Sequence, residues 1–181
     1  NRELSDLDML IPNSYHERVY SYWLNSYYNI FNTNKIMKNL AVRYDSINGT
    51  LNYVDTSLVV SNADRKRIAA QTSFIRAYHY FNLVRLYGGV FLISQPVSAA
   101  ESKYINRSSV ESIYKFIIAD LTNAIENGDA SSFGNMNISN LGRVNKWSAK
   151  ALLAKVYLTL NRKSDAISQL QDVISQSGYS L

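Results

Sequence analysis

The chain of 181 residues contains no cysteine, two prolines, seven glycines and two histidines. Without cysteine it can form no disulfide, thiolate metal site, catalytic thiol or lipidated cysteine. The shortage of proline and glycine argues against an all-β protein, which needs many tight turns. No apolar run is long enough to cross a bilayer as a helix. At 181 residues, 46% of them hydrophobic, the chain is long enough to bury a sizeable core.

Groups that could carry catalysis or hold a metal are sparse. His16 and His79 lack the helical spacing of a metal-binding pair, and we expect His79 to be packed or half-exposed. The carboxylates are dispersed and form no obvious acid–base pair. Gly88 and Gly89 follow an expected helix, so they end it and do not cradle a phosphate. The sequence therefore predicts no enzyme, no cofactor and no metal site.

Charge gives little indication of a partner. The net charge of +5 would allow an acidic partner, but lysines and arginines are scattered along the chain. The one basic run, at residues 65–67, stands near an expected helix start and is typical of a solvated helix face. No nucleic-acid-binding motif accompanies it. We expect no nucleic-acid partner.

Four sequence blocks carry the most information. Residues 74–93, FIRAYHYFNLVRLYGGVFLI, predict a helix that is apolar on more than one face and ends at two glycines. Its first stripe is Phe74, Ala77, Phe81 and Val84, and the adjacent face carries Tyr80, Leu83 and Tyr87. The other blocks are GRVNKWSAKALLAKVYLTL at 142–160, Trp23-x4-Tyr28-x-Ile30-x3-Asn34, and Ser-Gly-Tyr-x-Leu at 177–181.

In these four blocks the chain resembles the SusD/RagB family of outer-membrane nutrient-binding lipoproteins. The first block is similar to the family's R-A-x-x-Y-F-x-L-V-R-L-Y-G-D-V-P-L, with Gly89 in place of Asp and Phe91 in place of Pro. The second is similar to G-R-x-T-K-x-A-A-x-A-L-x-A-x-V-Y-L, where Asn145 replaces Thr as a helix N-cap. Both departures in the first block follow its helix, and they leave the geometry of the turn after that helix open.

Apolar spacing and caps predict five helices. The first spans about 14–39, opened by a Ser14–Glu17 capping box, and a loop over 41–61 follows. The second begins near Ala63 with Ser61 as its cap, and a long connection over 88–107 leads to the third. Ser108 and Glu111 open that helix, residues 127–129 end it, and a mobile loop runs to 142. The expected inward stripes are Val19, Trp23, Ile30, Asn34 and Met37 in the first helix, and Val110, Ile113, Ile117, Leu121 and Ala124 in the third.

The last two helices form a hairpin with tetratricopeptide-like spacing. Alanines mark the closest approach of the two helices, large residues surround it, and an asparagine takes the turn. The key positions are Leu153, Ala154, Tyr157, Asn161, Ala166, Leu170 and Val173. One pair cannot bury its own apolar face, so it needs stacked neighbours. We predict an all-α, tetratricopeptide-like α-solenoid of antiparallel helix pairs with long irregular loops, forming one domain over 1–181.

Polar residues on the apolar faces need partners. Arg76 and Arg85 lie in the second helix, and a buried guanidinium requires a carboxylate or a carbonyl. We expect them to form core ion pairs, with Asp120 as the partner of one, and ligand contact is the alternative. Asn34 is expected to be a hydrogen-bonded core residue.

The resemblance implies a non-catalytic, surface-exposed outer-membrane protein that binds an oligosaccharide or peptide. It would deliver the ligand to a SusC-like TonB-dependent transporter, and its lipid anchor is absent from this chain. The chain is then expected to be the amino-terminal helical portion of a longer protein. Among the aromatics of the first helix, Tyr20 and Tyr22 are the candidate ligand contacts, whereas Trp23 and Tyr28 are expected in the core.

Spacing alone supports an alternative function, a tetratricopeptide-type scaffold that holds a partner peptide. A hydrolase helical domain has no supporting residues.

Overall fold

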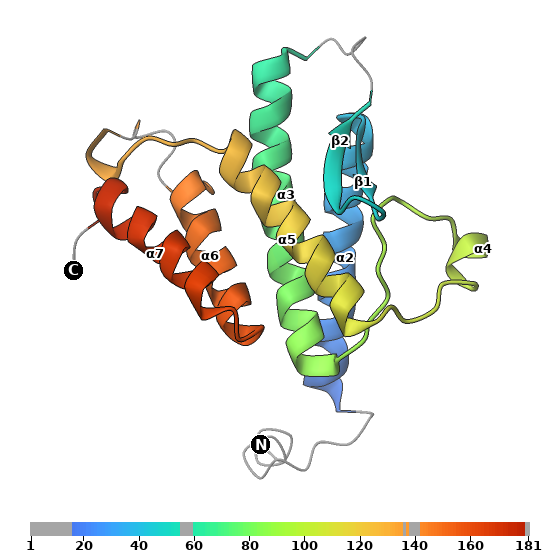
Figure 1. Cartoon of the computed structure of the whole chain (residues 1–181). Coiled ribbons are helices and arrows are strands. Elements are labelled where there is room, and N and C mark those ends of the chain that lie inside the picture. The colour runs from blue at the N-terminus through green and yellow to red at the C-terminus, as the bar shows by residue number, and fades with distance from the viewer. Residues whose placement is uncertain (1–15, 55–59, 136, 138–141, 180–181) are drawn as a thin grey trace.

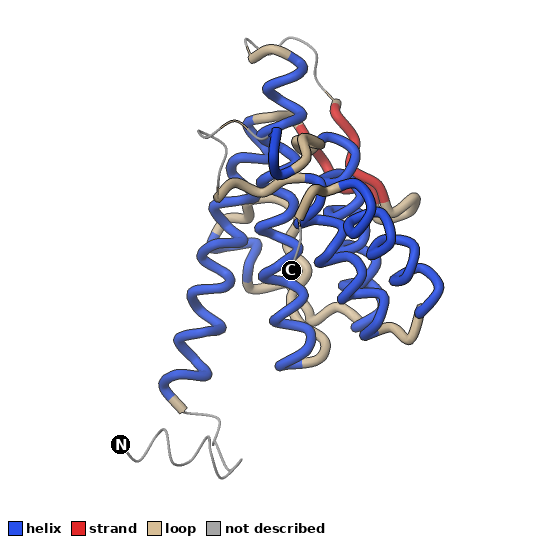
Figure 2. Tube along the Cα trace, turned by 90° about the vertical axis from the view of Figure 1, so that its left-hand side faces the viewer, coloured by secondary structure: helices blue, strands red, loops and turns tan. Residues whose placement is uncertain are grey.

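The structure is a computed structural model that describes residues 16–54, 60–135, 137 and 142–179. In this part of the chain, five long helices follow one another: α2 (Glu17–Asn39), α3 (Asn62–Tyr87), α5 (Val110–Asn127), α6 (Lys146–Thr159) and α7 (Lys163–Gln176). Each packs on the next one along the chain (Figure 1). Figure 2 shows the same array from the side, with long helices standing next to one another. This successive packing is the predicted α-solenoid.

Helix α3 lies at the centre of the array, between α2 and α5. Both of its predicted stripes contribute to one hydrophobic core, which we call the main core. The fully buried α3 members are Ala77, Tyr80 and Leu83, and α5 supplies Ile113, Phe116, Ile117 and Leu121. Covering more than one face of α3 requires helices on several sides, as predicted.

The connection after α3 folds back over the array. Gly88 ends α3 with a positive φ of 69°, and a Cβ on Gly89 would meet the Ser108 carbonyl at 2.7 Å. That close approach explains the glycine where the family pattern has aspartate. The Tyr80 hydroxyl accepts the Ile93 N–H at 2.8 Å, and Tyr27 donates to the Phe91 carbonyl at 2.9 Å. Tyrosine hydroxyls therefore hold this connection against the helices. The connection also contains a short helix, α4 (Ala99–Ser102), which the sequence did not predict.

The predicted loop over 41–61 contains an antiparallel hairpin, so this prediction was wrong in part. Strand β1 (Val42–Asp45) pairs with β2 (Thr50–Tyr53) in the register Val42↔Tyr53 to Asp45↔Thr50. The Asp45 carboxylate accepts the backbone N–H groups of Ile47 and Asn48, which stabilises the turn. The strands have four residues each and carry polar side chains, so their alternation is too short to recognise.

The observed helix starts match some of the predicted N-cap residues and not others. Ser61 accepts the Asp64 N–H at 3.1 Å and caps α3, as predicted. Helix α5 is capped by Ser109 instead of Ser108, and Val110 is exposed instead of belonging to the inward stripe. Helix α2 begins at Glu17, and Ser14 of the predicted capping box lies outside the described residues.

The α6–α7 pair has the predicted hairpin geometry. Asn145 caps α6 by accepting the Ser148 N–H at 2.8 Å, and Asn161 takes a left-handed φ of 57° at the turn. Ala154 and Ala166 are buried where the helices meet. Leu170, predicted to pack around this contact, is partly exposed on α7.

A buried ion pair joins α3 to α5. Arg76 and Asp120 are fully buried and form two hydrogen bonds, Nε–Oδ2 at 2.9 Å and Nη2–Oδ1 at 2.7 Å. Arg76 Nη1 also donates to Asn34 Oδ1 at 2.8 Å, which ties α2 into the same network. Burial raises the pKa of Asp120, and the Arg76 guanidinium opposes that shift. The predictions for Arg76, Asp120 and Asn34 are confirmed.

The same prediction is wrong for Arg85. Its side chain is exposed, and its guanidinium carbon lies 5.0 Å from the centroid of the Phe81 ring. Arg76 and Arg85 are nine residues apart, which on an α-helix turns them to opposite sides. Arg85 is therefore a surface residue that covers an aromatic ring.

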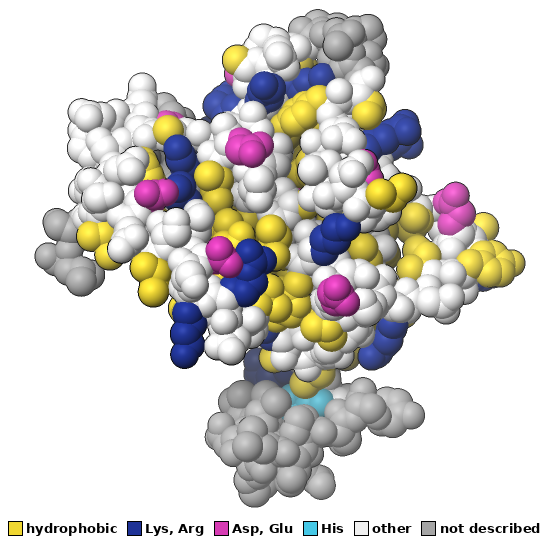
Figure 3. All heavy atoms as spheres, viewed as in Figure 1, with side chains coloured by type: hydrophobic (Ala, Val, Ile, Leu, Met, Phe, Trp, Pro, Cys, Tyr) yellow, Lys and Arg dark blue, Asp and Glu magenta, His cyan; other side chains and the backbone are white. Residues whose placement is uncertain are grey.

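The surface has mixed charge. Figure 3 shows lysine and arginine side chains interspersed with aspartate and glutamate on the face in view. Within the basic run, Arg65 is buried and donates to the Leu40 carbonyl at 2.7 Å, and Arg67 pairs with Asp64. The run is therefore not a uniformly solvated face. None of the described helices is both long and apolar enough to span a membrane.

Candidate functional site

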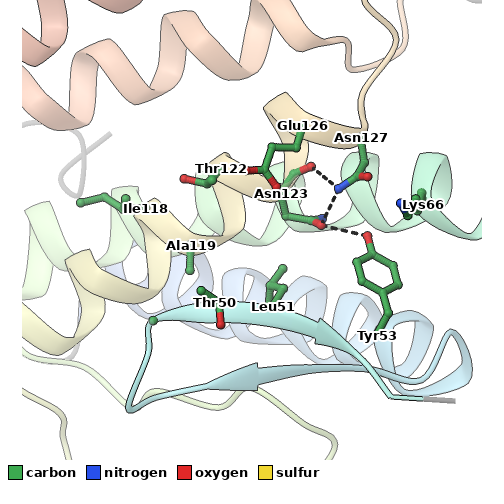
Figure 4. Close-up of a pocket in the computed structure, with 11 residues that line it drawn as sticks. Thr50, Leu51, Tyr53, Lys66, Ile118, Ala119, Thr122, Asn123, Glu126 and Asn127 are labelled. Atoms are coloured by element: carbon green, nitrogen blue, oxygen red, sulfur yellow. Dashed lines mark hydrogen bonds between the residues drawn. The ribbon is translucent and has the colours of Figure 1, made fainter.

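A polar groove of about 370 Å³ lies between the hairpin and α5 (Figure 4). Strand β2 forms one wall, the second half of α5 forms the other, and the first turns of α3 close one end. Its side chains are mostly polar: Thr50, Leu51, Tyr53, Lys66, Ile118, Ala119, Thr122, Asn123, Glu126 and Asn127.

A network of amides organises the groove. The Tyr53 hydroxyl donates to Asn123 Oδ1 at 2.8 Å, and Asn127 Nδ2 donates to the same oxygen at 3.0 Å. Asn123 is buried and passes its own Nδ2–H to Ser73 Oγ at 3.1 Å. Burial raises the pKa of Tyr53, although its bond to Asn123 opposes the shift. The phenol therefore stays protonated at neutral pH and keeps its donor directed at the amide.

The hairpin wall is fixed from outside the groove. Lys115 Nζ donates to the carbonyls of Ser46 and Ile47 at 3.0 and 2.8 Å, which ties the turn to α5. The Arg65 guanidinium stacks 5.1 Å from the Tyr53 ring centroid. A groove held in shape before a ligand arrives avoids part of the ordering cost of binding.

The rim carries hydrogen-bonding groups of both kinds. Lys66 offers donors, Glu126 offers acceptors, and Thr122 offers a hydroxyl that both donates and accepts. One cationic and one anionic side chain give the rim no strong preference for a ligand charge. This chemistry suits a neutral ligand rich in hydroxyl groups. Within the described ranges there is no cluster of three histidine or acidic side chains that could hold a metal ion.

The tyrosines predicted as ligand contacts lie elsewhere. Tyr20 and Tyr22 are 60% and 39% exposed and belong to the first half of α2, whereas the groove lies near its far end (Figure 1). Neither lines the groove. Their binding role stays a prediction.

The predictions for the other aromatic side chains have different outcomes. Trp23 packs against Tyr87, with ring centroids 4.9 Å apart, so its core role is confirmed. Tyr28 is 65% exposed and its predicted core role is wrong, because it points away from the face that α2 presents to α3. His79 is half-buried, as predicted, and burial lowers its pKa.

The groove residues were not singled out from the sequence. Asn123 and Asn127 stand one helical turn apart, which would have placed two amides on one face of α5. Tyr53 belongs to the segment 41–61, whose sequence predicts a loop, so the sequence predicts no wall opposite those amides. The sequence therefore contains a recognisable pattern for the α5 wall of the groove and none for the β2 wall.

The fold and groove define a class of protein: a helical-repeat array with a polar groove beside its loops. The chain belongs to the SusD-like family described as "Starch-binding associating with outer membrane", which matches residues 4–158.

Named relatives agree with this membership. The SusD-like protein P2 of Formosa agariphila is 35% identical over 134 residues, which are 72% of this chain and 25% of that protein. A SusD-like protein of Bacteroides ovatus is 33% identical over 113 residues, 61% of this chain and 19% of that protein.

Solved structures share the fold. A laminarin-binding SusD-like protein superimposes with a TM-score of 0.73 at 30% identity, over 89% of this chain and 32% of that one. A SusD superfamily protein of Parabacteroides distasonis gives a TM-score of 0.79 at 25% identity, over 98% and 36%. The chain thus spans a quarter or less of these curated relatives and about a third of the solved chains.

Proposed function

We propose that this chain is the amino-terminal helical portion of a surface-exposed, lipid-anchored glycan-binding protein. It binds an oligosaccharide without chemical change and passes it to a SusC-like TonB-dependent transporter in the outer membrane. The observation that carries the proposal is the SusD-like family match over residues 4–158. The laminarin-binding relative, at 30% identity, supports a glucan as the ligand.

The groove is our proposed ligand contact within the chain. Its hydroxyl, amide, amine and carboxylate groups can exchange hydrogen bonds with sugar hydroxyls, each of which donates and accepts. The Tyr53–Asn123 pair fixes one wall, so these groups are presented in one arrangement.

Affinity electrophoresis tests the glycan-binding proposal directly. Migration of the chain through gels containing starch or laminarin should be slower than through gels without polysaccharide. Equal mobility in all three gels contradicts glycan binding by this chain.

A pair of matched variants tests the groove. Thr122→Trp places a large ring at the groove wall and should weaken binding at least about tenfold, which corresponds to about 1.4 kcal/mol. Thr159→Trp places the same ring at an exposed α6 position outside the groove and should leave binding unchanged. If the two variants bind equally well, the ligand contacts another surface. Tyr20→Ala and Tyr22→Ala in the same gels test the earlier candidates.

Delivery is tested in the source bacterium. Deleting the gene should abolish growth on the bound polysaccharide and leave growth on its monosaccharide intact. Unchanged growth on the polysaccharide contradicts a role in uptake.

A further inference from the structure

A second cleft, of about 380 Å³, lies at the start of α6 and the end of α7. We call it the ring cleft, because Phe133, Trp147 and Tyr179 contribute to its lining. Phe133 belongs to the 3₁₀ turn η1 (Phe133–Asn135), and Tyr179 follows α7. The two rings lie 4.9 Å apart between centroids and are inclined by 38°. They are 50% and 49% exposed, so each presents a face or edge to solvent.

The backbone holds these rings in place. The Phe133 N–H donates to the Ser177 carbonyl at 2.7 Å, and the Tyr179 N–H donates to Ser177 Oγ at 3.2 Å. Ser177 itself is fully buried. One buried residue therefore fixes both ring-bearing segments, and the aromatic surface exists without a ligand.

Polar groups of known orientation border the rings. Asn145 Nδ2 donates to the Tyr179 hydroxyl at 3.4 Å, and Trp147 Nε1 donates to the Ser131 carbonyl at 3.0 Å. Trp147 is only 5% exposed, so it borders the cleft as a buried ring, and its N–H donor is already bonded. Arg143 is exposed at the rim and can offer its guanidinium donors to a ligand.

Exposed rings beside hydrogen-bond donors match the two-sided character of a pyranose. Its C–H-rich face stacks on an aromatic ring, and its hydroxyls need polar partners at the edge. An apolar peptide side chain would use the rings alone, whereas the hydroxyls of a sugar can also accept hydrogen bonds from Arg143. The lining therefore favours a sugar over an apolar side chain.

The ring cleft and the groove open at the same end of the array. Helices in the solenoid alternate in direction, so the α2–α3 connection, the α5–α6 connection and the end of α7 share one end (Figures 1 and 2). The groove lies beside the first of these connections, and the ring cleft is built from the other two.

We propose that the ring cleft is a second glycan subsite, in which a sugar residue stacks on Phe133 and Tyr179 and hydrogen-bonds to Arg143. This inference rests on the proposed function, because it extends the groove's oligosaccharide along the same end of the molecule. The groove holds one part of the chain, and the ring cleft holds a later sugar residue.

Trp147 provides a direct reporter. The chain has two tryptophans, Trp23 and Trp147, and Trp23 lies in α2 outside the ring cleft. In a Trp23→Phe chain, titration with laminarihexaose or maltohexaose should change the remaining Trp147 fluorescence. Binding detected by calorimetry without any change in Trp147 emission overturns the subsite.

Ring removal gives the second test. Phe133→Ala and Tyr179→Ala should each weaken hexasaccharide binding about 3- to 10-fold, the range expected for one lost stacking contact. Tyr179→Phe keeps the ring and should bind as the unchanged chain does. Tyr104→Ala removes an 84% exposed ring near α4 and is the matched control.

The outcomes separate the two proposals. If neither hexasaccharide binds the unchanged chain, glycan binding by this chain fails and the subsite fails with it. If a hexasaccharide binds and Thr122→Trp abolishes binding, but Phe133→Ala and Tyr179→Ala match Tyr104→Ala, the groove stands and the subsite is wrong. Circular dichroism of each variant checks that it remains folded.

Discussion

The α2–α3–α5 half and the α6–α7 pair are held together by different interactions. In the first half, Arg76 and Asp120 are buried together, and Asn34 joins the same network. In the α6–α7 pair, Ala154 and Ala166 allow close helix contact, and the ion pair Lys150–Asp172 is partly exposed. Removing one partner of a buried ion pair leaves an uncompensated buried charge, whereas enlarging a residue at an alanine contact overpacks the space between the helices. Loss of a charged side chain should therefore destabilise the first half most, and added side-chain volume should destabilise the α6–α7 pair most.

The largest effect is expected from Arg76→Met. It leaves the Asp120 carboxylate buried without its partner, and the free energy of unfolding should fall by about 3–5 kcal/mol. Urea denaturation followed by circular dichroism measures the loss. Arg85→Met, in the same helix but exposed, is the matched control and should change stability by about 0.5 kcal/mol or less.

The double variant sharpens this result. Replacing Arg76 by Met and Asp120 by Leu together removes both charges, so it should recover much of the stability that Arg76→Met loses. A single variant as stable as the Arg85→Met control would show that the buried pair does not hold the first half together.

The α6–α7 pair should respond to size. Ala166→Leu adds volume at the closest helix contact and should destabilise the chain by about 1–3 kcal/mol. Ser168→Leu adds a leucine to an exposed position of the same helix and serves as the control. Equal unfolding midpoints for the two variants in urea would mean that α7 does not pack on α6 through Ala166.

Alkaline pH should destabilise the α2–α3–α5 half of the molecule. Burial raises the pKa of Tyr27 and Tyr80 well above the value of about 10 in an unfolded chain. The native state keeps these protons while the unfolded state releases them, so stability is complete below pH 10 and falls as the pH rises further. At pH 10.5 each such tyrosine should cost about 0.8 kcal/mol.

Urea unfolding at pH 8 and pH 10.5 measures that difference. Tyr27→Phe should shrink the gap between the two pH values by the contribution of one tyrosine. Identical free energies of unfolding at both pH values would refute the assignment of these phenols as buried acids.

A further small effect is expected at the α6–α7 turn. Asn161 has a φ of 57°, where a side chain with a Cβ is strained and asparagine is better tolerated than alanine. Asn161→Ala should cost about 1 kcal/mol, and Asn161→Gly should be neutral or slightly stabilising. Thermal unfolding distinguishes them, with Asn29→Ala on the exposed side of α2 as the control. Equal melting temperatures for the alanine and glycine variants would contradict the left-handed turn.

Features set by local spacing could be predicted from the sequence. The apolar faces of α3, the alanine contact of α6–α7 and the cap at Ser61 each follow from residues within a few turns. The Arg76–Asp120 pair could also be inferred, because a charged residue on an apolar face needs an opposite charge. The same inference is wrong for Arg85, because the position of a residue around the helix axis decides whether its side chain is buried.

The groove could not be predicted, because it depends on contacts between distant segments. Tyr53 and Asn123 are 70 positions apart, and the short strands that carry Tyr53 show no usable periodicity. Lys115 reaches back to the hairpin turn over a similar separation. Such contacts arise only once the helices have fixed where the hairpin lies.

The hairpin packs on the helices at two places. Val42, Leu51 and Tyr53 form a small apolar cluster with Met37, Leu40 and Ala69, and Tyr44 packs on Phe116 of the main core. Consequently, residues of β2 that face solvent can vary without disturbing the helices beneath. A change at the exposed Thr50, for example, alters one wall of the groove and leaves the contacts of Tyr44, Leu51 and Tyr53 with the helices in place.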